Sequence, residues 1–234
     1  MSEIEHLLKE YLDYLEIERN RLPRTRENYE HYLRAFFRQA SIGRLNDLTL
    51  EAIRTFRLAL ARQNLKKSTQ SYYVIAIRNF LKYLIKRDHE VPSPDKIELP
   101  KLAPRQIDIL AYDELERLLS APQGNNLRSL RDRAILEILF STGLRLSELC
   151  GLSRYLDFSR GEFSVRGKGE KLRTIFLSSR AQQALKRYLE KRTDTEELLL
   201  VSLSKNRERP HVTGPMSTRA VQRMVDFYAR KAGI

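Results

Sequence analysis

A proline-rich stretch near the middle of the chain constrains the fold more than any other feature. Four of the eight prolines, Pro92, Pro94, Pro100 and Pro104, lie between residues 92 and 104 of the 234-residue sequence. Because proline lacks an N–H donor and restricts the residue before it, we expect no regular structure there. The sequence therefore predicts two domains, residues 1–90 and 109–234, joined by a basic, proline-stiffened linker over residues 91–108. The sequence leaves open whether this linker contacts a partner.

Residues 1–90 have the pattern of a helical domain. Apolar residues recur at helical spacing in residues 3–19 and in three later segments, and no strand candidate interrupts them. Thr25 and Thr49 are the expected N-caps of the second and third helices, and Lys66-Lys67-Ser68-Thr69 is expected to open the fourth. We predict four short helices around one core.

The charge of the chain favours a polyanionic partner. The net charge is +13, and residues 21–87 hold 15 Lys or Arg against four Asp or Glu, whereas residues 1–20 are acidic. An anionic membrane is the weaker interpretation, because no basic amphipathic helix is paired with exposed large apolar groups. Six basic residues near helix starts or on polar faces are the expected phosphate contacts: Arg24, Arg26, Arg62, Lys66, Lys67 and Arg78.

The second domain is predicted to be helical with one small antiparallel sheet over residues 156–158, 162–166 and 172–177. Gly143 supplies the backbone freedom for a tight corner between two helices. Arg145 lies at that corner, where its guanidinium can fork onto a phosphate, and Glu148 lies in the first turn of the next helix. Gly167 and Gly169 predict a hairpin turn that presents Lys168.

These two segments, "STGLRLSELCGL" and "RGKGEKLRTIFL", resemble the active site of the tyrosine recombinases of the phage-integrase and Xer type. The resemblance implies a mainly α fold with a small antiparallel sheet, in which a helical, SAM-like core-binding domain precedes part of an α+β catalytic domain. It implies DNA cleavage and rejoining through a phosphotyrosyl intermediate, without metal or other cofactor. By position, Arg145 clamps the scissile phosphate, Lys168 donates a proton to the leaving 5′ oxygen, and Glu148 helps to order the site.

The neighbouring cations of the hairpin have supporting roles in this interpretation. Lys171 and Arg173 are candidates to lower the pKa of Lys168 or to contact a phosphate. Lys171 is also the alternative catalytic lysine, and the sequence does not decide between the two lysines.

The family site further needs a His-x-x-Arg element and a tyrosine nucleophile, and the resemblance places both after a helix that ends like "FYARKAGI". We expect a recombinase truncated before this second catalytic half, as a shortened fragment rather than a natural gene product, which binds DNA without cleaving it. Tyr228 is expected to be a core residue, so no nucleophile is assigned in this chain. His211 has Gly214, not Arg, three residues later. The alternatives are a noncatalytic DNA-binding module or regulator of recombination and, more distantly, a helical adaptor for acidic proteins.

The expected partners are double-stranded DNA and further recombinase subunits, which form tetramers on two duplexes in intact family members. We expect a monomer off DNA and a cytoplasmic protein with no membrane partner, since no apolar run approaches a membrane span. The single cysteine, Cys150, favours a reducing compartment. The target site, and the choice between chromosome-dimer resolution and mobile-element integration, stay open.

Overall fold

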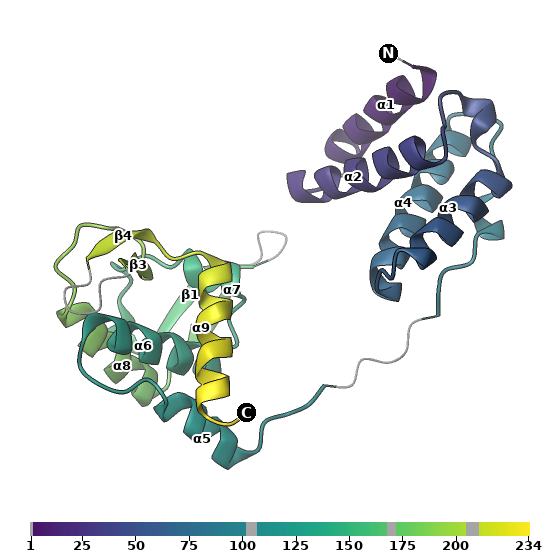
Figure 1. Cartoon of the computed structure of the whole chain (residues 1–234). Coiled ribbons are helices and arrows are strands. Elements are labelled where there is room, and N and C mark those ends of the chain that lie inside the picture. The colour runs from purple at the N-terminus through teal and green to yellow at the C-terminus, as the bar shows by residue number, and fades with distance from the viewer. Residues whose placement is uncertain (1, 102–106, 168–171, 205–210) are drawn as a thin grey trace. The chain divides into compact units, whose positions relative to one another are not determined.

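The computed structural model describes residues 2–101, 107–167, 172–204 and 211–234. The chain divides into two units, residues 1–106 and 107–234, and each has its own hydrophobic core (Figure 1). The described residues are mainly α-helical, with two small antiparallel sheets that both lie in the second unit. The predicted fold class is confirmed, with one sheet more than the sequence indicated.

The described residues of the first unit form four helices and two short 3-10 turns. The helices are α1 (Glu3–Ile17), α2 (Pro23–Gln39), α3 (Leu50–Arg62) and α4 (Lys67–Lys86), and the 3-10 turns are η1 (Leu45–Asp47) and η2 (Pro94–Lys96). The core is rich in aromatic rings: Phe36 contacts Phe56 at a centroid distance of 5.1 Å, and Tyr11 contacts Phe80 at 5.3 Å. These contacts join α2 to α3 and α1 to α4, so that all four helices share one core.

Of the two threonine caps predicted for the first unit, one is present. Thr49 caps α3 as predicted, because its hydroxyl accepts a hydrogen bond from the Ala52 N–H at 3.1 Å. Thr25 does not cap α2. This helix begins two residues earlier at Pro23, whose fixed φ and missing N–H suit the first helical position.

The proline-rich stretch is less irregular than the sequence indicated. Pro94 to Lys96 form the 3-10 turn η2, and the Ser93 hydroxyl accepts a hydrogen bond from the Asp95 N–H. Ile97 is buried in the core of the first unit. The prolines therefore exclude an α-helix here but allow one tight turn that packs against α4.

In the second unit, α6 (Leu127–Thr142) is the central helix, and it packs against α5 (Tyr112–Ser120), α8 (Ser179–Glu190) and α9 (Thr218–Lys231). Side chains on most of its circumference are buried, and they include Arg131, Asp132 and Glu137. The short helix α7 (Leu146–Cys150) follows directly after α6. Its neighbour in space is α9, which comes more than 60 residues later in the sequence.

The first sheet is the predicted hairpin of β1 (Glu162–Arg166) and β2 (Leu172–Phe176), paired from Glu162↔Phe176 to Arg166↔Leu172. Residues 156–158 are not a strand. Asp157 instead accepts a hydrogen bond from the Ser159 N–H and caps the 3-10 turn η3 (Phe158–Arg160). The second sheet pairs β3 (Val201–Leu203) with β4 (Val212–Pro215) and was not predicted.

Candidate active site

The corner between α6 and α7 is built by Gly143. This residue has φ 59° and ψ 25°, and its N–H bonds to the Leu139 carbonyl at 3.0 Å. Left-handed backbone of this kind ends a helix at low cost only when the residue is glycine or a small polar residue. The chain turns sharply there and begins α7 after Arg145, whose side chain stays 59% exposed.

The carboxylate of Glu148 fixes Arg145 at this corner. Glu148 Oε2 accepts the backbone N–H of Arg145 at 2.8 Å, and Oε1 accepts Nη1 of the same residue at 2.9 Å. The first bond closes the N-terminal turn of α7 and the second orients the guanidinium. No described residue accepts from Nη2 or Nε of Arg145 through a hydrogen bond, so these donors can meet a ligand.

Arg173 of β2 brings the hairpin to the same carboxylate. Its Nη1 and Nη2 donate to Oε1 and Oε2 of Glu148 at 3.1 and 2.7 Å. The bidentate Arg173 bonds, followed by the Arg145 N–H, lower the pKa of Glu148 to about 2, although only 8% of this side chain is exposed. Two guanidinium groups around one carboxylate leave a net positive site.

The paired strands β1 and β2 end next to this cluster. Leu172, the residue before Arg173, pairs with Arg166, and the connection between them begins at Gly167. Lys168 and Lys171, the two candidate catalytic lysines, lie outside the described residues. Of the predicted site residues, the structure thus brings Arg145, Glu148 and Arg173 together, and it leaves the choice between the lysines open.

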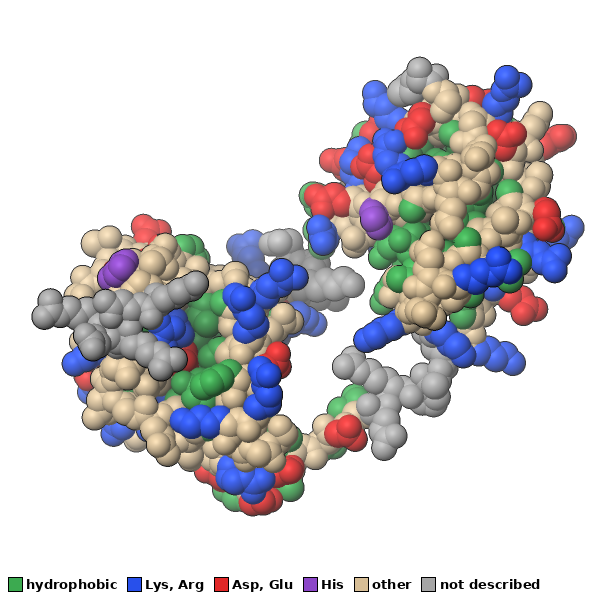
Figure 2. Space-filling view, in the orientation of Figure 1, with side chains coloured by type: hydrophobic (Ala, Val, Ile, Leu, Met, Phe, Trp, Pro, Cys, Tyr) green, Lys and Arg blue, Asp and Glu red, His purple; other side chains and the backbone are tan. Residues whose placement is uncertain are grey.

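The predicted phosphate contacts of the first unit differ in their exposure and in whether they form ion pairs within the protein. Arg62, Lys66 and Lys67 are exposed without an ion-pair partner among the described residues. Arg24 is exposed and pairs with Glu27 at 3.0 Å. Figure 2 shows Lys and Arg side chains on the visible faces of both units, with acidic side chains among them.

Arg26 and Arg78 are largely engaged within the protein. Arg26 lies within 3.2 Å of Glu16 and 3.3 Å of Glu30. Arg78 donates to the Ile97 carbonyl at 2.9 Å and lies 3.5 Å from Asp95, which ties α4 to the segment after it.

Tyr228 is a core residue of α9, as expected. Its hydroxyl donates to Asp132 Oδ2 at 3.1 Å, and Asp132 Oδ1 accepts two further bonds from Arg131 at 2.8 and 2.6 Å. Burial and the Asp132 charge raise the pKa of Tyr228 to about 12. The hydroxyl is therefore buried, protonated and bonded, which does not suit a nucleophile.

The sequence did not reveal this buried Arg131–Asp132 pair, because charged neighbours within an apolar helix have no pattern of their own. Arg131 Nη1 also donates to the Val201 carbonyl at 2.8 Å, so the pair joins α6 to β3. His211 is exposed, and its backbone pairs with Ser204. Among the described residues no group of three His, Cys, Asp or Glu side chains could hold a metal ion.

Family comparisons cover both units. Residues 108–234 match the "Phage integrase family" and residues 8–88 match "Phage integrase, N-terminal SAM-like domain". The chain belongs to the phage integrase family of tyrosine recombinases. Its catalytic-domain match contains the whole Arg145–Glu148–Arg173 cluster.

The relatives of this tyrosine recombinase include proteins named tyrosine recombinase XerC. The protein of Syntrophus aciditrophicus is 32% identical, and the match covers 99% of this chain and 79% of the relative. The protein of Pelobacter propionicus is 34% identical over 93% of this chain and 72% of its own length. The Escherichia coli protein is 30% identical over 100% of this chain and 78% of its own.

Solved structures of integrases share the fold. A λ integrase dimer bound to a core site matches with TM-score 0.73 and 18% identity, over 100% of this chain and 82% of that one. A Tn1549 integrase in complex with circular intermediate DNA matches with TM-score 0.71 and 20% identity, over 98% and 80% of the two chains. In the described part of this recombinase, no helix has the length and apolarity needed to cross a membrane.

Proposed function

We propose that this recombinase chain binds duplex DNA and that Arg145 contacts the scissile phosphate. The observation that carries the proposal is the exposed Arg145 guanidinium, oriented by a single bond to Glu148 with further N–H donors unbonded. An arginine in this state can offer two parallel donors to a phosphate without first breaking its own support.

Arg173 acts in this proposal as the positioning residue. It holds the Glu148 carboxylate ionised through two bonds, and Glu148 in turn holds Arg145. Since phosphoryl transfer depends on fixed cations around the nonbridging oxygens, a preoriented Arg145 lowers the reorganisation needed when DNA binds. Either Lys168 or Lys171 serves as the proton donor to the leaving oxygen.

The first unit supplies nonspecific phosphate contacts. Arg62, Lys66 and Lys67 are the strongest candidates because their charges are exposed and unpaired among the described residues, and Arg24 and Arg26 follow. Arg78 is left out of this proposal, because its guanidinium already bonds Ile97 and Asp95. We further propose that several copies act together on DNA, and one solved relative is described as a λ integrase tetramer bound to a Holliday junction.

The chain is proposed to bind DNA without cleaving it alone. Tyr228 lies in the segment that precedes the family's tyrosine element, and its buried hydroxyl is committed to Asp132. A nucleophile must reach the phosphorus in line, which a bonded core hydroxyl does not do.

Fluorescence anisotropy with a labelled duplex at several salt concentrations tests DNA binding. We expect log K to fall with log salt, and Arg145→Gln to weaken binding and reduce the slope by about 0.9. Arg160→Gln is the matched control, because Arg160 is also exposed and paired with one acid, Asp157 at 3.0 Å. A slope that is unchanged in Arg145→Gln contradicts the phosphate role.

A nicked suicide substrate tests the absence of cleavage. We expect no adduct that resists denaturation in detergent. An adduct that Tyr228→Phe abolishes would show that the chain carries its own nucleophile.

A further inference from the structure

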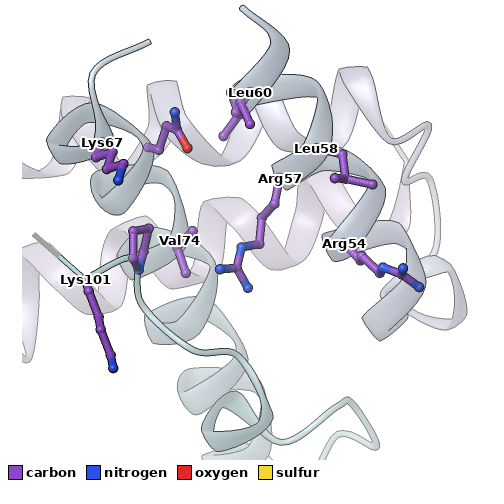
Figure 3. A pocket seen from close by; sticks show the side chains of 10 residues that line it. Arg54, Arg57, Leu58, Leu60, Lys67, Val74 and Lys101 are labelled. Atoms are coloured by element: carbon purple, nitrogen blue, oxygen red, sulfur yellow. The ribbon is translucent and has the colours of Figure 1, made fainter. Parts of the chain in front are cut away.

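A pocket in the first unit is lined by four cations, and only one of them, Lys67, is also a proposed DNA contact. It lies between α3, α4 and the segment at Pro100 and Lys101, and has a volume of about 460 Å³. That volume falls in the range of roughly 300–1,000 Å³ found for ligand sites. Arg54, Arg57, Lys67 and Lys101 line it, and Figure 3 shows the Arg57 side chain extending from α3 toward α4.

The pocket is apolar as well as cationic. Its apolar lining includes Leu58, which is 49% exposed, the half-buried Pro100, and the core residues Leu60 and Val74. Arg57, Lys67 and Lys101 have no ion-pair partner among the described residues, and Arg54 has only Glu51 at 3.7 Å. A phosphate alone leaves such an apolar surface uncovered, so the chemistry fits a segment that carries aliphatic side chains next to carboxylates.

The same chain displays a segment of that kind. Ile107-Asp108-Ile109-Leu110 has no regular secondary structure, and Ile107 and Ile109 are 73% and 88% exposed. Asp108 between them has no ion-pair partner among the described residues. The acids that follow are engaged within the protein: Asp113 pairs with Arg117, Glu116 pairs with Arg180, and Glu114 accepts the Ala111 N–H. Among the described residues, Asp108 is therefore the free acid that the segment offers to the basic pocket.

We propose that this pocket receives the Ile107–Leu110 segment of a second copy of the chain. In an extended strand Ile107 and Ile109 point to one side, where they cover Leu58 and Pro100, while Asp108 lies at the level of the long cationic side chains. Such a contact is heterologous, because pocket and segment are different surfaces, and heterologous contacts can close into rings. The inference rests on the proposed action of several copies on DNA and names a surface through which they touch.

Cysteine crosslinking between two differently tagged copies tests this contact in the absence of DNA, and the crosslink that we expect there replaces the earlier expectation of a monomer off DNA. One copy carries Ala61→Cys at the pocket and the other Ala111→Cys beside the segment, both in a Cys150→Ala background that removes the single native thiol. With a short bismaleimide we expect a crosslinked heterodimer. In the matched control, the second copy carries Gln222→Cys, an exposed position on α9, in place of Ala111→Cys. We expect this pair to give only the background yield of nonspecific crosslinking.

Charge reversal then tests the electrostatic part. Arg57→Glu is expected to lower the crosslink yield about tenfold, equivalent to ~1.4 kcal/mol. Arg38→Glu, the same change at an exposed residue outside the pocket, leaves the yield unchanged. Combining Arg57→Glu in one copy with Asp108→Arg in the other restores it.

Two outcomes overturn the proposal. One is a yield no greater than that of the Gln222→Cys control. The other is a combination of two results: duplex DNA abolishes the crosslink, and Arg57→Gln reduces the slope of log K against log salt for DNA binding. Together these results would identify the pocket as a phosphate site. Since the crosslink is measured without DNA, its failure is distinct from a failure of the wild-type chain to bind DNA.

Discussion

Arg173 and Glu148 form a bidentate ion pair, with Nη1 and Nη2 at 3.1 and 2.7 Å from the two carboxylate oxygens. The pair joins the β1–β2 hairpin to the N-terminal turn of α7 across 25 residues of sequence. The same carboxylate also bonds Arg145, the residue proposed to contact the scissile phosphate. The position of the Arg145 guanidinium therefore depends on the hairpin. Arg145 and the hairpin strand β2 are therefore linked through one acidic side chain.

The depressed pKa of Glu148 predicts a pH-dependent contribution to stability. A carboxyl group whose folded pKa of about 2 lies below its unfolded value near 4.5 stabilises the fold above pH 4.5 and loses this effect as the pH falls toward 2. We expect Glu148→Gln to lower the free energy of unfolding by about 1–2 kcal/mol at pH 7, a modest value because both arginines are partly exposed. The difference from wild type should shrink between pH 4.5 and 2.

Urea denaturation at several pH values, followed by circular dichroism, measures this difference. Glu162→Gln is the control, because Glu162 is exposed on β1 and has no ion pair among the described residues. A difference that stays constant with pH would mean that Glu148 does not act through its charge.

Gly143→Ala is expected to cost about 1 kcal/mol of stability. No atom lies within 4 Å of the added Cβ, so the cost comes only from placing an L-residue at φ 59°. Gly143→Asn should cost less, since asparagine tolerates this region. Gly151, at the other end of α7, has φ −90°, and Gly151→Ala is expected to be close to neutral. Thermal unfolding of the three variants checks the order, and equal losses at both glycines would contradict the backbone explanation.

Local features of this fold were predictable, whereas features that depend on distant partners were not. The Gly143 corner and the Thr49 cap follow from residues within one turn of each other. The β3–β4 sheet was missed because β3 has only three residues and β4 contains both Gly214 and Pro215, which are rare in strands.

In the candidate site, too, the local contacts were predictable from the sequence and the long-range contacts were not. The motif placed Arg145 and Glu148 together because they are three residues apart on one helix. It did not assign Arg173 to Glu148, since that contact depends on how the sheet packs against α7. Arg78 was expected on DNA because it is basic, but its acceptor is a backbone carbonyl 19 residues away, which no charge pattern reveals.

The buried Asp132 carboxylate is expected to contribute more to stability than the Tyr228 hydroxyl that bonds it. Asp132→Ala leaves the Arg131 guanidinium buried without its partner, which costs about 3–5 kcal/mol. Tyr228→Phe removes one hydrogen bond to a charged acceptor and should cost about 1–2 kcal/mol. Tyr188→Phe is the matched control, because Tyr188 is also buried and donates to a neutral carbonyl, that of Leu199 at 3.0 Å. Denaturation curves should rank the three losses in the order Asp132, Tyr228, Tyr188, and a Tyr228→Phe variant of unchanged stability would contradict a core role.

The salt dependence of DNA binding should separate free cations from engaged ones in the first unit. Lys66→Gln and Lys67→Gln each remove an exposed charge, and each is expected to reduce the slope of log K against log salt by about 0.9. Arg78→Gln is expected to leave the slope unchanged and instead to lower stability by about 1 kcal/mol, because it breaks the bond to the Ile97 carbonyl. Anisotropy titrations between 50 and 200 mM salt measure the slopes, and thermal unfolding measures the stability. If Arg78→Gln reduces the slope as much as Lys67→Gln does, Arg78 must release its internal partners to bind phosphate, and Arg78 is then a DNA contact as well as a structural cation.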